Sequence, residues 1–220
     1  MITDQPLWYR QIGAALTKHI VLKAIGTPTF IALFFVAYLH LLKHPAFAVS
    51  IMPFTALDAL IPYQPSTMPM YLSLWVYVSL PSSLLTTRRE LFTYASAMTA
   101  TCLTGLIIFY VWPSAVPAAS IDWSQHASMA YLKSVDAGGN AFPSLHVATA
   151  VFSAMWLHDV LRRFRAPGWL LVLNSVWCAG IIYSTLATRQ HVIVDVIGGL
   201  ILGAVMAQYA LRKQAKSTIP

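Results

Sequence analysis

The sequence predicts an all-α membrane protein with six transmembrane helices and an N-terminal interfacial helix. Of its 220 residues, 58% are hydrophobic and only 10% are charged, and the mean hydropathy is +0.65. Apolar stretches of about 20 residues, long enough to cross a bilayer, alternate with short basic clusters. This composition excludes an ordinary soluble domain, so residues 1–220 are expected to form a single membrane-embedded domain.

The N-terminal segment differs from the other apolar stretches because charges interrupt it. Residues 5–24 combine leucine, tryptophan and isoleucine side chains with Arg10, Lys18 and Lys23, a mixture typical of a helix lying in the membrane interface. Residues 1–26 are therefore predicted to be an interfacial anchor. The same charges leave no compact apolar core for a cleavable signal peptide, so the N-terminus is expected to be retained.

Six apolar stretches, bounded by prolines or basic residues, are predicted to be the transmembrane helices. They cover about residues 27–43, 68–87, 91–112, 143–161, 167–187 and 191–211. The second is expected to be interrupted by Pro81. The proline-rich connection between the first two is expected to contain a short re-entrant or surface helix. Residues 113–141 are more polar than the rest of the chain and are predicted to be the longest loop outside the membrane.

The basic residues indicate how the helices are oriented. With six spans both termini lie on one side, and that side receives eleven of the fourteen Lys and Arg residues. The other side holds Lys43, Lys133 and Arg189. By the positive-inside rule the termini are cytoplasmic, so the 113–141 loop and the loop before His191 face the periplasm or the exterior. The predicted location is the plasma membrane of a bacterium.

A polar stretch from Tyr183 to Asp195 stands before the last predicted span. His191 and Asp195 are four residues apart, so both lie on one face if a helix starts there, and the carboxylate can reach the imidazole. A carboxylate facing hydrocarbon costs about 2.5–3.5 kcal/mol, which predicts a partner for Asp195. Arg189 offers a planar fork of donors that suits phosphate oxygens. This stretch is therefore predicted to hold a phosphate group.

A second polar stretch, from Gly138 to Val147, opens the fourth predicted span. Ser144 stands at the expected N-cap of that helix, and the glycines upstream let backbone N–H groups converge. A helix start with free N–H donors attracts an anion. The chain crosses the membrane twice between His146 and His191, so both histidines are expected on the same face.

Two histidines that face one phosphate have separable roles. His191, held by Asp195 through its other nitrogen, is the expected nucleophile, and His146 is the expected proton donor to the departing oxygen. Phosphoryl transfer needs mainly positioning and charge stabilisation, so no metal and no cofactor are expected. The phosphate-binding residues predicted in the two stretches are Arg189, Ser144, Gly139 and Asn140.

Both stretches resemble signature motifs of the type 2 phosphatidic acid phosphatase superfamily, a family of six-span lipid phosphatases and phosphotransferases. The run Pro143-Ser144-Leu145-His146 is similar to the second motif of the family. Ser184, with seven residues to His191 and four more to Asp195, opens a stretch similar to the third motif. The resemblance covers about residues 113–205 and implies a phosphatase-like domain.

The resemblance also implies a role for each matching residue. His191 would be the nucleophile, Asp195 would orient it, and His146 would be the general acid. Ser144 and Ser184 would bind phosphate, although Ser184 is alternatively interpreted as bonding within its own helix.

The chain departs from the family pattern at three places. Leu145 replaces the usual glycine, Thr185 stands where an arginine normally follows the serine, and the first motif is not recognisable. Lys133, on the expected outer side, is the predicted substitute for the missing phosphate-binding lysine. Pro-Ser-Leu-His also resembles the second motif of the branch related to inositol phosphorylceramide synthases. Trp112 to Pro117 lies at the position where that branch has a proline-rich motif.

The sequence therefore favours a lipid phosphatase acting on a phosphate monoester or pyrophosphate, with three alternatives. The first is a phosphotransferase that moves phosphate or a phospho-headgroup to a lipid or sugar hydroxyl. The second is a zinc site made by His146, His191 and Asp195, and the third is a proton-coupled transporter. Expected partners are a lipid phosphate and membrane lipids. No nucleic acid is expected, because the basic residues mark the ends of spans, and the oligomeric state is left open.

Two further interpretations concern packing. Gly199 and Gly203 are spaced for close helix packing within the bundle. Tyr71 is interpreted as an interfacial or packing residue.

Overall fold

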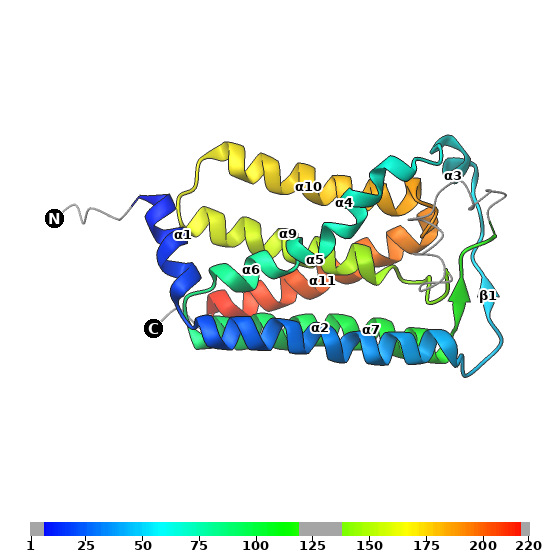
Figure 1. Cartoon of the computed structure of the whole chain (residues 1–220), viewed down its shortest axis with the longest axis horizontal. Coiled ribbons are helices and arrows are strands. Elements are labelled where there is room, and N and C mark those ends of the chain that lie inside the picture. Colours follow the sequence, from blue (N-terminus) through cyan, green and yellow to red (C-terminus); the bar gives the residue numbers. More distant parts are fainter. Residues whose placement is uncertain (1–6, 119–137, 217–220) are drawn as a thin grey trace.

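The computed structural model describes residues 7–118 and 138–216. Long helices lie side by side along one axis and form a bundle (Figure 1). These helices are α2 (Ile20–Lys43), α7 (Arg88–Val111), α9 (Leu145–Arg163), α10 (Gly168–Ala187) and α11 (Ile193–Lys216). The structure is nearly all-α, as predicted.

The N-terminal helix α1 (Trp8–Thr17) lies across one end of the bundle (Figure 1). It ends where His19 adopts a left-handed conformation, with φ of 54°, and turns the chain into α2. A separate short helix is therefore present, and its position in the membrane interface stays a prediction. Its boundary is different, because the first long helix begins at Ile20 instead of residue 27.

The predicted span over residues 68–87, interrupted by Pro81, is an interrupted helical segment whose breaks lie elsewhere. The chain instead forms a 3-10 turn, η1 (Pro65–Thr67), and three short helices, α4 (Met68–Leu72), α5 (Leu74–Tyr77) and α6 (Ser79–Leu84). The breaks lie at Ser73 and Val78. Serine hydroxyls at or next to them donate to backbone carbonyls, Ser73 to Met70 at 2.6 Å and Ser79 to Trp75 at 3.0 Å. Such bonds compete with regular helix formation.

Among the described residues, four helices are long and apolar enough to cross a membrane, namely α2, α7, α10 and α11. The protein is therefore a membrane protein, and the predicted count of six spans is not confirmed. Helix α9 falls outside this group, and it carries charges in its last turns, including Asp159 and Arg163. Those charges are consistent with a helix whose C-terminal end lies at the bundle surface.

A small parallel sheet joins β1 (Ser50–Ile51) to β2 (Ser114–Ala115), which the all-α prediction did not include. It links the connection after α2 with the segment after α7. The short helix α3 (Ala56–Leu60) follows β1, as expected for the proline-rich connection. These elements lie together at the end of the bundle opposite to α1 (Figure 1).

Helix α9 is packed against α10, α11, α7 and α6 and forms the centre of the bundle. It lies very close to α11, because a Cβ added to Gly199 would lie 2.4 Å from the Ser144 carbonyl oxygen. A Cβ added to Gly203 would lie 2.3 Å from the Ala148 carbonyl oxygen. The prediction of close packing at these glycines is confirmed.

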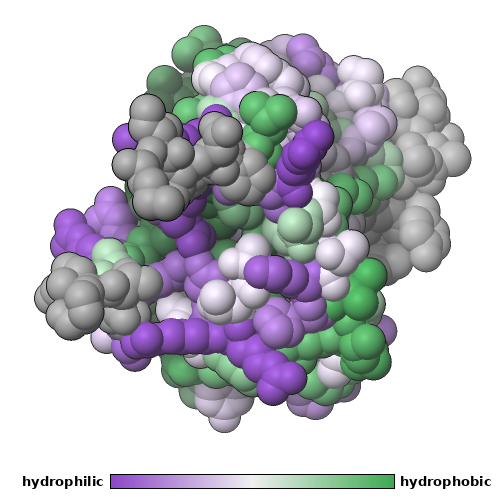
Figure 2. Space-filling model, turned by 90° about the vertical axis from the view of Figure 1, so that its left-hand side faces the viewer, coloured by the Kyte–Doolittle hydropathy of each residue, from purple (hydrophilic) through white to green (hydrophobic). Residues whose placement is uncertain are grey.

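Polar contacts tie the helices together at the end that carries α1. Glu90 forms a capping box with Thr87 at the start of α7, pairs with Arg163 of α9, and accepts a bond of 3.2 Å from Gln214 of α11. Figure 2 looks onto this end and shows hydrophilic side chains gathered across it.

Candidate active site

The start of α11 presents the predicted histidine–aspartate pair. The Asp195 side chain is fully buried, and its Oδ2 lies 3.4 Å from His191 Nδ1. Oδ2 also accepts a hydrogen bond of 3.1 Å from the Val192 N–H. The 3.4 Å separation is longer than an ordinary hydrogen bond, as is common at catalytic pairs without substrate. The pairing leaves His191 Nε2 as the nitrogen available for reaction.

The start of α9 lies directly beside this pair. Ser144 caps the helix, because its Oγ accepts a hydrogen bond of 3.2 Å from the Val147 N–H. The Ser144 N–H in turn donates to the Asp195 carbonyl oxygen at 3.0 Å. The two polar stretches, far apart in sequence, are thus joined by a backbone hydrogen bond, and Ser144 is the N-cap that the sequence predicted.

His146 is held by Tyr71 of α4. Its Nε2 lies 3.1 Å from the Tyr71 carbonyl oxygen, and the two rings stack with centroids 4.0 Å apart. A carbonyl oxygen only accepts, so this contact places a proton on Nε2. In the charged imidazolium the other nitrogen, Nδ1, also carries a proton and can donate it.

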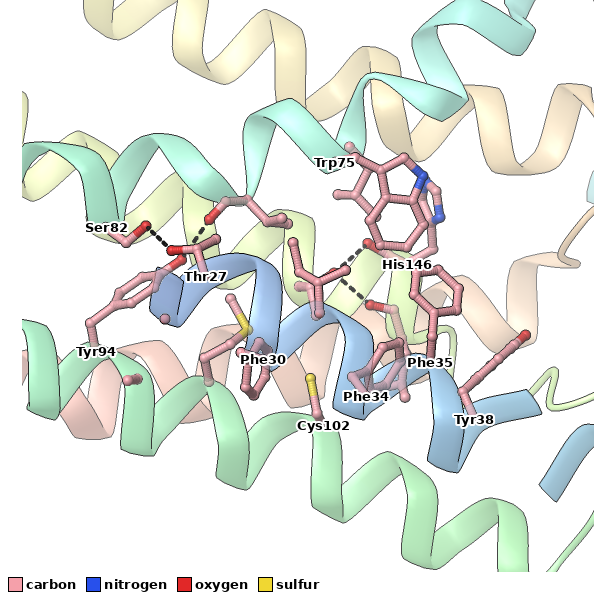
Figure 3. Close-up of a pocket in the computed structure, with 18 of the residues that line it drawn as sticks. Thr27, Phe30, Phe34, Phe35, Tyr38, Trp75, Ser82, Tyr94, Cys102 and His146 are labelled. Carbon is pink, nitrogen blue, oxygen red and sulfur yellow. Dashed lines mark hydrogen bonds between the residues drawn. The ribbon is translucent and has the colours of Figure 1, made fainter. Parts of the chain in front are cut away.

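Both histidines line one cavity of about 340 Å³, together with Asn140. Figure 3 shows His146 at one end of this cavity, near Trp75 and Tyr38. His191 is 10% exposed at its side chain, so it is shielded from bulk water yet reachable from the cavity. The structure therefore brings together the two predicted catalytic histidines.

Asn140 and Gly139 shape the backbone before α9. Asn140 adopts a left-handed conformation, with φ of 51°, and its Nδ2 donates to the Tyr38 carbonyl oxygen at 3.1 Å. A Cβ on Gly139 would lie 2.6 Å from Leu42 Cδ1, so this glycine lies close to the Leu42 side chain of α2. Both contacts attach this segment to α2.

Arg189 is hydrogen-bonded to the C-terminal end of α3. Its two terminal nitrogens donate to the carbonyl oxygens of Asp58, at 3.1 Å, and Ile61, at 2.8 Å, and its guanidinium lies 5.3 Å from the centre of the Phe54 ring. Arg189 does not line the cavity. Its predicted role as a phosphate ligand stays a prediction.

Two further predicted phosphate ligands lie away from the cavity lining or outside the described residues. The Ser184 hydroxyl is fully buried and donates to the Ile181 carbonyl oxygen at 2.6 Å within α10. This geometry agrees with the alternative interpretation of an intrahelical bond. Lys133 lies outside the described residues.

Asp58 is a site residue that the sequence analysis missed. It is 1% exposed, and its Oδ1 accepts a hydrogen bond of 2.8 Å from the Ile193 N–H at the start of α11. Its Oδ2 accepts bonds from the backbone N–H and hydroxyl of Thr55. The capping pattern Thr55-x-x-Asp58 was the available signal, whereas the contact with Ile193 has no local signature.

Gln190 was also missed. Its side chain is 3% exposed, and neither its Nε2 nor its Oε1 has a hydrogen-bond partner within the described residues. Leaving a buried amide unpaired costs about 1–3 kcal/mol. It adjoins His191, so an unpaired donor lies next to the predicted nucleophile.

The structure also bears on the zinc alternative. Among the described residues, no group of three or more His, Cys, Asp or Glu side chains is arranged to hold a metal ion. His146 is directed to Tyr71 and His191 to Asp195, so the three candidate ligands do not converge on one point.

Comparison with known proteins gives two matches. The family model described as the PAP2 superfamily matches residues 86–219. The inositol phosphorylceramide synthase catalytic subunit aur1 of Schizosaccharomyces pombe is 34% identical over 70 residues, which are 32% of this chain and 15% of that protein. The similarity thus covers a small part of a longer relative. No solved structure matches the chain significantly.

Proposed function

Because this chain belongs to the PAP2 superfamily, whose members are lipid phosphatases or phosphotransferases, we propose that it hydrolyses the phosphate monoester or pyrophosphate of a lipid. The observation that carries the proposal is the geometry of two histidines on one cavity, one of them paired with a buried carboxylate. This arrangement suits attack on phosphorus by one imidazole and proton donation by the other.

In the first step, His191 Nε2 attacks phosphorus and forms an N–P bond. The bond between phosphorus and the lipid oxygen breaks, and that oxygen takes the proton from His146. Asp195 holds the Nδ1 proton of His191 and compensates the positive charge that develops on the ring. The lipid alcohol, or the lipid monophosphate from a pyrophosphate, leaves.

In the second step, water attacks the phosphohistidine. His146, now neutral, accepts a proton from the water, and the N–P bond breaks to release inorganic phosphate and restore His191. No redox partner is needed, and each proton that leaves His146 returns to it.

The phosphate oxygens need donors near the two histidines. The first N–H groups of α9 after Ser144 offer the usual anion site at a helix start, and the unpaired Gln190 amide adds a donor beside His191. We assign Ser144, Gly139 and Asn140 to this site as backbone and capping residues that shape it.

The active site is proposed to face the periplasm or the cell exterior. Both histidines lie at the bundle end opposite to α1 and to the C-terminal end of α11 (Figure 1). The end with α1 carries most of the basic residues, so it is assigned to the cytoplasm.

The test is release of inorganic phosphate from a panel of lipid phosphates by the purified protein in nanodiscs. The panel contains phosphatidic acid, phosphatidylglycerol phosphate and an isoprenoid diphosphate. We expect turnover with at least one of them and a loss of at least about a hundredfold in His146→Ala and His191→Ala. Normal turnover in His191→Ala would reject the mechanism.

A phosphotransferase is the second candidate, favoured by the similarity to an inositol phosphorylceramide synthase subunit. The same phosphohistidine, or a related intermediate, would then transfer its group to a lipid or sugar hydroxyl. Product analysis with added acceptors separates the two, because a hydrolase releases phosphate stoichiometrically with lipid consumed. A transferase yields a phosphorylated acceptor in place of free phosphate.

A further inference from the structure

The cavity next to the histidines extends far along the bundle. Its walls come from α2, from α4 to α6, from α7 and from the start of α9, and most of the lining is apolar or aromatic (Figure 3). On α2 the lining residues recur at intervals of three and four, which places them on one helix face. They are Leu22, Lys23, Gly26, Thr27, Phe30, Ile31, Phe34, Phe35 and Tyr38.

One end of the cavity is the candidate active site. Asn140 and His146 line it there, and the hydrogen bond from Asn140 to the Tyr38 carbonyl oxygen sets this end at the level of Tyr38 on α2. His191 is the one lining residue from the segment before α11. A phosphate bound by the histidines would therefore lie at the mouth of an apolar channel.

The opposite end of the cavity is polar, and polar contacts connect the elements that form it. The hydroxyls of Thr27 on α2 and Ser82 on α6 lie 3.5 Å apart (Figure 3). Beyond them, Lys23 Nζ donates to the carbonyl oxygens of Ala15 and Ser83, each at 2.7 Å. Lys23 also lines the cavity, as do Leu22 and Gly26, so this end of the cavity is marked by polar groups on α2 and α6.

The length of the apolar section matches a membrane lipid chain. Thr27 and Tyr38 are eleven residues apart on α2, a distance of about 16 Å at the helical rise per residue. A bilayer core is about 30 Å thick, so one leaflet, and thus one extended chain, measures about 15 Å.

The volume of the cavity indicates one chain. An apolar cavity of about 150 Å³ holds one benzene molecule, and the cavity here, of about 340 Å³, is a little more than twice that size. This size suits a single hydrocarbon chain.

We propose that this cavity binds one hydrocarbon chain of the phosphorylated lipid, extending from His146 toward the polar end at Thr27 and Ser82, and that the length of the cavity selects the length of the chain. The inference rests on the proposed function for the identity of the headgroup. The occupant follows from the continuity of the channel with the two histidines, from its apolar lining and from its length.

Cys102 provides the test, because it is 4% exposed, lines the cavity and lies between Phe30 and Phe34 (Figure 3). Cys102→Phe would obstruct the channel midway. The measurement is kcat/KM of the full chain in nanodiscs for dihexanoyl and dipalmitoyl forms of the same lipid phosphate. We expect the ratio of long-chain to short-chain kcat/KM to fall by about tenfold or more, the discrimination typical of a hydrophobic pocket.

Cys178 is the matched control, since it is also buried, at 8% exposure, but lies on α10 outside the cavity lining. Cys178→Phe should leave the chain-length ratio unchanged even if total activity falls. A ratio in Cys102→Phe equal to that of the wild type, or an equal change in both variants, would overturn the proposal.

A binding readout keeps this inference separate from the proposed activity. Hexadecylphosphonate should raise the melting temperature of the wild type more than hexylphosphonate does, and Cys102→Phe should abolish that difference. This result without any phosphate release would overturn the proposed function and retain the chain site. Phosphate release with no chain-length effect in either assay would retain the function and overturn the chain site.

Discussion

Asp195 is a fully buried carboxylate whose Oδ1 has no hydrogen-bond partner within the described residues. Burying a charge is unfavourable unless a partner compensates it, and the partner at hand is His191, at 3.4 Å. A positive charge on His191, as develops when the ring attacks phosphorus, would strengthen this pair. The buried carboxylate is thus arranged to stabilise a state in the reaction more than the resting state.

Asp195→Asn tests this role directly. The amide has nearly the same shape but no charge, so we expect kcat to fall by about a hundredfold or more with little change in KM. Steady-state kinetics with a lipid phosphate give both constants, and the melting temperature checks folding. Unchanged kcat in a folded variant would show that Asp195 has only a packing role.

Arg189 presents a choice between two roles. The structure engages its guanidinium with two carbonyl oxygens at the end of α3, whereas the sequence predicts contact with phosphate. Arg189 makes these two bonds from two separate nitrogens of a planar fork, which lysine lacks, so Arg189→Lys should lower stability by about 1–3 kcal/mol. Denaturant unfolding measures this loss. A variant with normal stability and a raised KM would instead support direct phosphate binding.

At the scale of elements, the short helix α3 holds the start of α11. Asp58 Oδ1 accepts from the Ile193 N–H, and the backbone carbonyl of the same residue accepts from Arg189. Asp58 thus contacts residues that precede and follow His191 in the sequence, namely Arg189 and Ile193. The segment that resembles a surface connection in the sequence therefore positions the predicted nucleophile.

Asp58→Ala should remove the cap of α11 and destabilise the protein by about 1–2 kcal/mol. We expect kcat to fall as well, because His191 directly precedes α11 and would move with the start of that helix. The control is Asp159→Ala, at the other end of the bundle, where a partly exposed pair with Arg163 contributes about 0.3–0.5 kcal/mol. Equal losses in the two variants would contradict the positioning role of α3.

The close approach of α9 and α11 depends on glycine. In Gly203→Ala the new Cβ would overlap the backbone at Ala148, so the helices must separate, and we expect a loss of about 1–3 kcal/mol. In Gly13→Ala the new Cβ meets nothing within 4 Å, and the better helix propensity of alanine should stabilise α1. Thermal unfolding compares the two, and a neutral Gly203→Ala would contradict this packing.

For the whole molecule, the sequence predicted those parts that depend on local pattern. Long apolar stretches gave most of the long helices, and Ser144 was identified as an N-cap because capping follows from adjacent residues. The interruption of the second span was predicted at Pro81, whereas the breaks lie at Ser73 and Val78, because hydropathy does not report the serine bonds that compete with a helix. Tyr71 and Asp58 reach the site through contacts across the bundle, which no local pattern reports.

The orientation in the membrane is a further prediction at this scale. Helix α1 and the C-terminal end of α11 lie at one end of the bundle, and the candidate site lies at the other (Figure 1). In intact cells, a membrane-impermeant thiol reagent should label Phe47→Cys, near the site end, and should not label Thr17→Cys, at the end of α1. The reverse pattern would place the site in the cytoplasm.

The most direct test of the central claim is to trap the covalent intermediate during a single turnover. The protein in nanodiscs is mixed with a lipid carrying a radiolabelled phosphate and quenched at short times under alkaline conditions, which preserve phosphohistidine. The account predicts transient label on the peptide containing His191 in the wild type, and no label in His191→Ala. Turnover without a labelled intermediate, or label that persists in His191→Ala, would contradict it.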